Sequence, residues 1–242
     1  MCFSAGASFT SGALLSVIGT ETLRKVHKPS QIVFACIPLF FAFQQFAEGI
    51  LWVSVNHPEY AFVRTVSMYI FLALAWVVWP SLVPLSVIML EGNKTRKKII
   101  GFFLAAGALV SVFNLYGMLM FKADARITGA HIEYQSGFDI PFGYNAIIFY
   151  LAATIAPLFV SSVRRMHVFG AIIALSFIVS VIFYTRCLTS VWCFFAAVIS
   201  FVVYYIIYDA HVKFKPELLN AAGREIKKSL KELAPKAGKL KK

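Results

Sequence analysis

Residues 31–55 read QIVFACIPLFFAFQQFAEGILWVSV, an apolar run long enough to cross a membrane as one helix. Polar side chains interrupt it at Gln44, Gln45 and Glu48, and Trp52 follows one turn later. Residues three, four and seven positions apart share one face of a helix, so these side chains point the same way. A carboxylate near the centre of a membrane helix costs about 2.5–3.5 kcal/mol even on the lenient insertion scale. We therefore interpret this face as part of a ligand-binding site.

The rest of the chain repeats this apolar pattern. It is 60% hydrophobic and 14% charged, whereas a soluble domain carries roughly 25% charged residues. Apolar runs near the length of a membrane span occupy residues 5–23, 31–55, 61–90, 99–121, 144–163, 168–184 and 190–208. The sequence predicts an all-α fold, a bundle of seven transmembrane helices over residues 1–208. Pro80 and Pro84 predict a break or kink in the third segment.

Basic residues indicate how the bundle is oriented. If all seven segments cross, nineteen Lys and Arg lie on one side of the membrane and Arg64, Lys122, Arg126 and Arg186 on the other. Cytoplasmic loops are rich in Lys and Arg, so we expect the N-terminus outside and the C-terminus in the cytoplasm. The net charge of +12 follows from this asymmetry and from a basic tail, and we expect no nucleic-acid partner.

Residues 209–242 form a separate basic region. Apolar side chains spaced three and four residues apart alternate there with Lys, Arg and Glu: Leu219, Ala222, Ile226, Leu230 and Leu233. This pattern is typical of an amphipathic helix on a membrane surface. We expect the tail to contact anionic lipid headgroups, and docking to a protein partner is the alternative.

The predicted topology brings other polar residues to the outer half of the bundle. The candidates for ligand binding beside Gln44, Gln45, Glu48 and Trp52 are Asn114, Tyr144, Asn145, Tyr184 and Arg186. Arg186 is the nearest cation to Glu48 by depth, so an ion pair that only joins two helices is the alternative to a pocket. Residues 122–143 form the one long outer connection, for which we expect a short hairpin or a lid.

Three of the four cysteines map to the outer side: Cys2, Cys187 and Cys193. An oxidising compartment favours a disulfide, either Cys187 with Cys193 or Cys2 with one of them. Free thiols are the second interpretation, and a metal site on these three cysteines is the third. The Cys-x5-Cys spacing matches no strong zinc pattern, so the cofactor stays unknown, with a metal ion possible.

The sequence lacks the residues that other kinds of cofactor site require. No predicted segment contains a lysine, which excludes a retinal Schiff base. The sequence has no HExxH motif and no Gly-rich phosphate loop.

Two stretches carry a resemblance to a known family. The chain begins MCFSAGASF, and residues 44–52 read QQFAEGILW. Both are similar to a family of uncharacterised bacterial multi-span membrane proteins, which begin Met-Cys-Phe-Ser and have Gln-Gln-x-x-Glu-Gly-x-x-Trp in the second helix. The resemblance implies a multi-span bacterial membrane protein and supplies no activity. For such a protein we expect the inner membrane as its location.

Three functions are consistent with these patterns. The first is binding or transport of a small molecule or ion in a polar pocket in the outer half of the bundle. The second is a membrane-embedded enzyme or redox protein that uses thiols or a metal. The third is an accessory structural subunit of a larger membrane complex.

Overall fold

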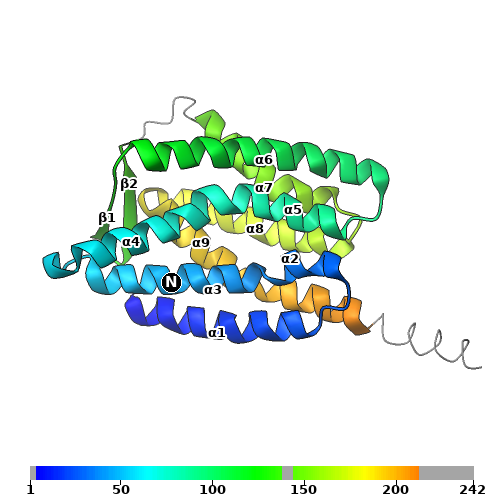
Figure 1. Ribbon diagram of the computed structural model, residues 1–242, viewed down its shortest axis with the longest axis horizontal. Helices are drawn as coiled ribbons and strands as arrows, with labels where there is room; N and C mark the ends of the chain where they lie inside the picture. Colours follow the sequence, from blue (N-terminus) through cyan, green and yellow to red (C-terminus); the bar gives the residue numbers. More distant parts are fainter. Residues whose placement is uncertain (1–3, 138–143, 213–242) are drawn as a thin grey trace, which may run out of the picture.

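The computed structural model describes residues 4–137 and 144–212. Its helices lie side by side along the long axis of the molecule (Figure 1). Each of the seven predicted segments contains helix within this described part. The helices are α1 Ala5–Arg24, α2 Ile32–Ala35, α3 Ile37–Ser54, α4 Ala61–Leu72, α5 Trp79–Leu90, α6 Lys94–Met120, α7 Tyr144–Val160, α8 Arg164–Phe183 and α9 Leu188–Ile199, followed by helix at residues 201–212.

Five stretches of helix among the described residues are long and apolar enough to cross a membrane: Pro29–Ser54, Pro58–Leu90, Lys94–Met120, Arg164–Phe183 and Thr185–Val212. Large apolar side chains face outward on these rods, as Phe102, Leu109 and Leu119 do on α6, each more than 70% exposed. An outward apolar surface of this kind fits lipid rather than water. These helices indicate a membrane protein. Of the tail predicted at residues 209–242, residues 209–212 continue the last of these helices, and the rest lies outside the described residues.

The first and second segments pack closely because α1 offers glycine where α3 approaches. A Cβ added to Gly19 would lie 2.5 Å from the Leu39 side chain and 3.1 Å from its backbone nitrogen. Small residues at such positions let membrane helices approach closely. The α1–α3 pair therefore fixes one wall of the bundle and the rotation of α3 within it.

The third segment is interrupted between α4 and α5 by a π-helix, Ala73–Val78. Pro80 has no N–H to donate to the carbonyl of Trp76, which leaves that oxygen without its helical partner. Side chains of neighbouring helices bond the exposed carbonyls instead. Asn114 donates to Trp76 O at 2.8 Å, Ser111 to Val77 O at 2.6 Å and Tyr150 to Ala75 O at 2.6 Å. The predicted break is thus a π segment held from α6 and α7.

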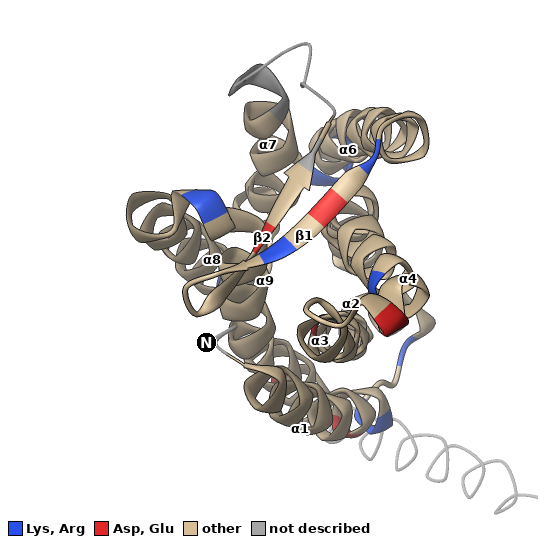
Figure 2. Ribbon diagram, turned by 90° about the vertical axis from the view of Figure 1, so that its left-hand side faces the viewer, with Lys and Arg blue, Asp and Glu red and all other residues tan. Residues whose placement is uncertain are grey.

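A β-hairpin covers one end of the bundle, which confirms the hairpin expected in the long connection. Strands β1, Ala123–Thr128, and β2, His131–Ser136, pair antiparallel around Gly129, whose φ is 63°. Ile132 is fully buried, and the Tyr134 ring stacks on Phe71 of α4 with centroids 4.8 Å apart. Figure 2 shows the hairpin lying across the helix ends.

Glu133 joins the two strands of the hairpin through its side chain. Its carboxylate accepts hydrogen bonds from Arg126 at 3.2 Å, from Thr128 at 2.8 Å and from Gln135 at 3.2 Å. These donors hold the pKa of Glu133 at about 2, well below its usual value. The carboxylate therefore stays ionised across the physiological pH range.

A carboxylate also joins the loops at the opposite end. Glu91, which is 4% exposed, accepts hydrogen bonds from the Ser162 backbone N–H at 2.7 Å and its hydroxyl at 2.8 Å. Burial raises the pKa of a carboxyl, but bonds from the backbone of Asn93 and from Ser162, with the nearby Arg96 charge, outweigh it and lower the pKa of Glu91. This bond fixes the end of α5 to the α7–α8 turn.

Candidate functional site

The polar face of α3 lies inside the bundle. Gln44, Gln45 and Glu48 are each 0% exposed, and Trp52 is partly buried. The close α1–α3 packing turns this face away from lipid and toward the helices opposite. The structure thus brings the first predicted site residues together in the interior, as their spacing predicts.

Two side-chain hydrogen bonds tie this face to other helices. The Ser190 hydroxyl of α9 donates to Glu48 Oε1 at 2.5 Å, and the Trp79 indole of α5 donates to Gln44 Oε1 at 3.0 Å. The Cys193 thiol, one turn after Ser190 on α9, lies beside both Gln44 and Glu48. Side chains of α3 and α9 therefore form one buried polar cluster, which we define as Gln44, Gln45, Glu48, Ser190 and Cys193, and Trp79 of α5 bonds to it.

Several buried polar atoms of the cluster and its surroundings lack a hydrogen-bond partner. Both the nitrogen and the oxygen of the Gln45 amide are unpaired, as are Gln44 Nε2, Trp52 Nε1 and Ser8 Oγ. A buried polar group without a partner costs roughly 1–3 kcal/mol. A protein interior rarely leaves an amide unsatisfied at both atoms. These atoms therefore have unused capacity to bind water or a ligand.

Three of the other predicted ligand-binding residues, Asn114, Tyr184 and Arg186, lie apart from the cluster. Asn114 bonds the π segment, and the Tyr184 ring packs edge-on against His131 of the hairpin, with centroids 4.9 Å apart. Arg186 is exposed in the turn between α8 and α9, whereas Glu48 is fully buried. No ion pair joins these two residues in the described structure. Tyr144 and Asn145 begin α7, and their side chains lie outside the described part.

The disulfide prediction is wrong for Cys187 and Cys193, because both are free thiols. Cys187 precedes α9 and Cys193 lies within it, six residues further on. Six residues of helix rise about 9 Å, beyond the roughly 7 Å that a disulfide can span between Cα atoms. Cys2, the third residue of the predicted metal site, lies outside the described residues. Within residues 4–137 and 144–212, no three His, Cys, Asp or Glu side chains are grouped so as to hold a metal.

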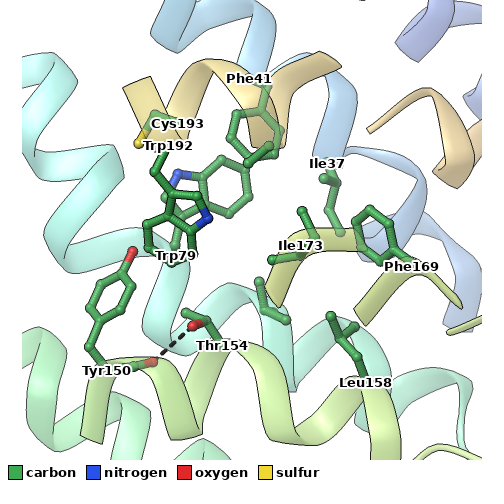
Figure 3. Close-up of a pocket in the computed structure, with 12 residues that line it drawn as sticks. Ile37, Phe41, Trp79, Tyr150, Thr154, Leu158, Phe169, Ile173, Trp192 and Cys193 are labelled. Carbon is green, nitrogen blue, oxygen red and sulfur yellow. Dashed lines mark hydrogen bonds between the residues drawn. The ribbon is translucent and has the colours of Figure 1, made fainter. Parts of the chain in front are cut away.

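A cavity of about 50 Å³ lies next to the polar cluster. Five helices line it, and Figure 3 shows aromatic rings along one side, with Trp79, Trp192 and Tyr150 close together. Its lining residues are Ile37, Phe41, Trp79, Val83, Tyr150, Thr154, Leu158, Phe169, Ile173, Trp192, Cys193 and Ala196. Gln44, Gln45 and Glu48 are not among them, so this cavity is mainly apolar and meets the cluster at Cys193.

Three residues that order the site were not among the predicted site residues: Trp79, Ser190 and Trp192. The polar residues at the start of the seventh segment indicated where its outer end lies. They did not identify Ser190 as the hydrogen-bond partner of Glu48. Trp79 gave no signal of its own, because an indole beside a proline is ordinary in an apolar helix. Only the rotation of α5 and α9 against α3 brings these side chains to the cluster.

Comparison with known proteins gives a family and no function. No curated protein and no solved structure matches the chain. A model of a family of unknown function, DUF6629, matches residues 1–215. The match covers every helix and strand described above, and the chain therefore belongs to the DUF6629 family.

Proposed function

We propose that this protein is a multi-pass protein of the bacterial inner membrane that binds a small polar molecule or ion at the buried cluster around Glu48. All seven segments would cross the bilayer, with the N-terminus and the hairpin outside. The Lys and Arg asymmetry supports this orientation. So does the alternation of successive helices between the hairpin end and the Glu91 end (Figure 1). The cluster would then lie in the outer half of the membrane.

The observation that carries the proposal is the Gln45 amide, fully buried with both its nitrogen and its oxygen unpaired. In a bilayer no bulk water can reach such an amide, so its unsatisfied nitrogen and oxygen lower the stability of the folded protein. A ligand that both donates and accepts hydrogen bonds would satisfy them. Trp52 Nε1 offers one more donor beside the same helix face.

Glu48 supplies the charged group of the site. An intramembrane carboxylate is a site hypothesis by default, because such groups are rare in membrane helices and mark ligand or proton pathways. Its bond to Ser190 holds one oxygen toward α9. The ligands that fit best are therefore small cations, amines and amides, which can approach a carboxylate and an amide together.

Thermal unfolding of the purified protein in detergent tests the proposal. The probes are alkali and divalent cations, small amines and small amides, added one at a time. At least one probe should raise the unfolding midpoint of the wild type, and Glu48→Gln and Gln45→Leu should each abolish that rise.

Ser200→Ala is the matched control, because Ser200 is equally buried but donates only to Ala197 O of its own helix. This variant should keep the response. The proposal is wrong if no probe stabilises the wild type, or if the response survives both substitutions in the cluster.

A further inference from the structure

The cavity beside the cluster is apolar, and several of its lining side chains are aromatic. Phe41 stacks on Trp79 with ring centroids 4.1 Å apart, and Trp192 packs edge-on against Tyr150 at 5.8 Å and Phe177 at 4.9 Å. These contacts fix both indoles in place. The cavity is therefore a preformed space with rigid walls, the property expected of a small-molecule site.

One polar atom of the cavity wall has no partner. Among the twelve lining residues, Trp192 Nε1 is the one buried side-chain nitrogen or oxygen that bonds nothing. Tyr150 and Thr154 are already engaged, donating to the backbone oxygens of Ala75 and Tyr150. In Figure 3 the nitrogen of the Trp192 ring lies on the side that faces Ile173, across the cavity. The wall thus offers a single free donor in an apolar surround.

The size and lining of the cavity narrow what can occupy it. About 50 Å³ gives room for roughly four water-sized groups. Water itself fits poorly, because a buried water typically makes about three hydrogen bonds and this wall offers few polar atoms. A charged ligand would find no counter-ion among the lining residues. An uncharged molecule with an apolar body and one acceptor oxygen satisfies both the wall and the indole.

We propose that this cavity, lined by Trp79, Tyr150 and Trp192, binds a small uncharged membrane-soluble molecule whose carbonyl-type oxygen accepts the Trp192 Nε1 hydrogen. This is a second site, and it depends neither on Glu48 nor on a polar ligand at the cluster. The apolar body lies against Ile37, Leu158 and Phe169, and the oxygen is turned toward α9. Entry from the bilayer concentrates such a ligand near the site.

Two probes of matched shape test this proposal: acetone and 2-methylpropene, which have four heavy atoms each and differ only in C=O against C=CH2. Affinity is measured from the concentration dependence of the unfolding midpoint of the full chain in detergent. The quantity compared is the ratio of ketone affinity to alkene affinity. Comparing this ratio between variants cancels the different partitioning of the two probes into the micelle.

The ratio should be roughly fivefold lower in Trp192→Phe than in the wild type, since the variant keeps a ring and loses one neutral hydrogen bond. Trp76→Phe is the control, because Trp76 does not line the cavity, and its ratio should equal that of the wild type. An unchanged ratio in Trp192→Phe overturns the proposal, as does failure of both probes to stabilise the wild type. Neither result bears on the Glu48 site, whose response is tested with different probes.

A second measurement uses the unmodified protein, so that the test does not depend on the folding of Trp192→Phe. The chain has four tryptophans, each with one indole N–H signal in a ¹H–¹⁵N spectrum. The ketone should move one indole signal to lower field, as a new hydrogen bond does, and the alkene should not. Equal shifts with both probes would show that the oxygen is not recognised.

Discussion

Ser190 and Glu48 form the longest-range side-chain bond in the polar cluster, joining residues 142 apart in the chain. Both residues are fully buried, and the 2.5 Å distance is typical of a hydroxyl donating to a carboxylate. A single hydroxyl therefore sets the position of one carboxylate oxygen. At the scale of the residue, this bond links α3 to α9 within the cluster.

Ser190→Ala should lower the free energy of unfolding by about 1–2 kcal/mol, because a hydrogen bond to a buried carboxylate is lost. The measurement is reversible unfolding in mixed micelles. Ser200→Ala removes a hydroxyl that is equally buried but bonds within its own helix, and it should cost less than about 0.5 kcal/mol. Equal losses of unfolding free energy in the two variants would mean that the Ser190–Glu48 bond contributes no more than a hydroxyl bonded within its own helix.

At the scale of the element, the α4–α5 rod depends on its neighbours for its backbone bonds. The carbonyls of Ala75, Trp76 and Val77 accept hydrogen bonds from Tyr150, Asn114 and Ser111. Helices α5 and α6 also lie in close contact at this point. A Cβ added to Gly107 of α6 would overlap Pro80 O of α5. The π segment is therefore stable only where α6 and α7 pack against it.

Asn114→Leu should destabilise the protein by about 1–3 kcal/mol, since the carbonyl of Trp76 then lacks a partner in an apolar surround. The same unfolding assay measures the change. Asn56→Leu, in the exposed turn after α3, should stay within about 0.5 kcal/mol of the wild type. A loss at Asn114 no larger than at Asn56 would contradict the role given to this amide.

The hairpin should weaken in acid. The pKa of Glu133 is lowered to about 2, so its contribution is fully present above the usual carboxyl pKa and is lost as pH falls toward 2. Glu133→Gln should therefore be less stable than the wild type near pH 7, and the difference between their unfolding midpoints should shrink between about pH 5 and 2. A difference that does not vary with pH would show that ionisation of Glu133 is not involved.

At the scale of the whole molecule, the charged side chains of the described helices lie near the two ends of the rods, with Glu48 as the exception. Between these ends, five of the described helical stretches are long and apolar enough to cross a bilayer. The end that carries Glu91 and Arg96 has the larger share of the basic residues, and it is the end that we place in the cytoplasm.

Cysteine labelling tests this orientation in whole cells. In a background with the native cysteines replaced by alanine, Asn56→Cys at the hairpin end should react with a membrane-impermeant maleimide. Gly92→Cys should react only after the cells are opened. Both positions are exposed, so access depends on the side of the membrane. The opposite labelling pattern would show that the orientation is reversed. Labelling of both positions in intact cells would show that they do not lie on opposite sides of the membrane.

Local patterns predicted the helices well, because an apolar run needs no knowledge of its neighbours. The first segment was predicted at residues 5–23 and is observed at Ala5–Arg24. The fourth was predicted to begin at residue 99 but begins at Lys94, because Asn93 accepts hydrogen bonds from the N–H groups of Thr95 and Arg96 and caps the helix there. Basic residues extend a helix beyond its apolar part, and a search for apolar runs overlooks them.

The site was predictable only in part, for a physical reason. Gln44, Gln45 and Glu48 share a face because of helix periodicity, which the sequence contains. Ser190 and Trp79 reach that face because of helix rotation and tilt, which depend on packing across the bundle. The wrong disulfide has a separate cause: Cys187 and Cys193 both map to the outer side, but a helical rise of about 9 Å separates them along α9.

The π-helix at Ala73–Val78 also limits how the length of this chain can vary. A π segment is in effect an α-helix with one residue added, so it offsets the helix faces before and after it by about 100°. Deleting one residue from Ala73–Val78 would restore regular helix there and rotate α4 relative to α5. Phe71 would then turn away from Tyr134, and the hairpin would lose its support. Relatives that keep the hairpin should therefore keep the number of residues in this segment, even where its amino acids differ.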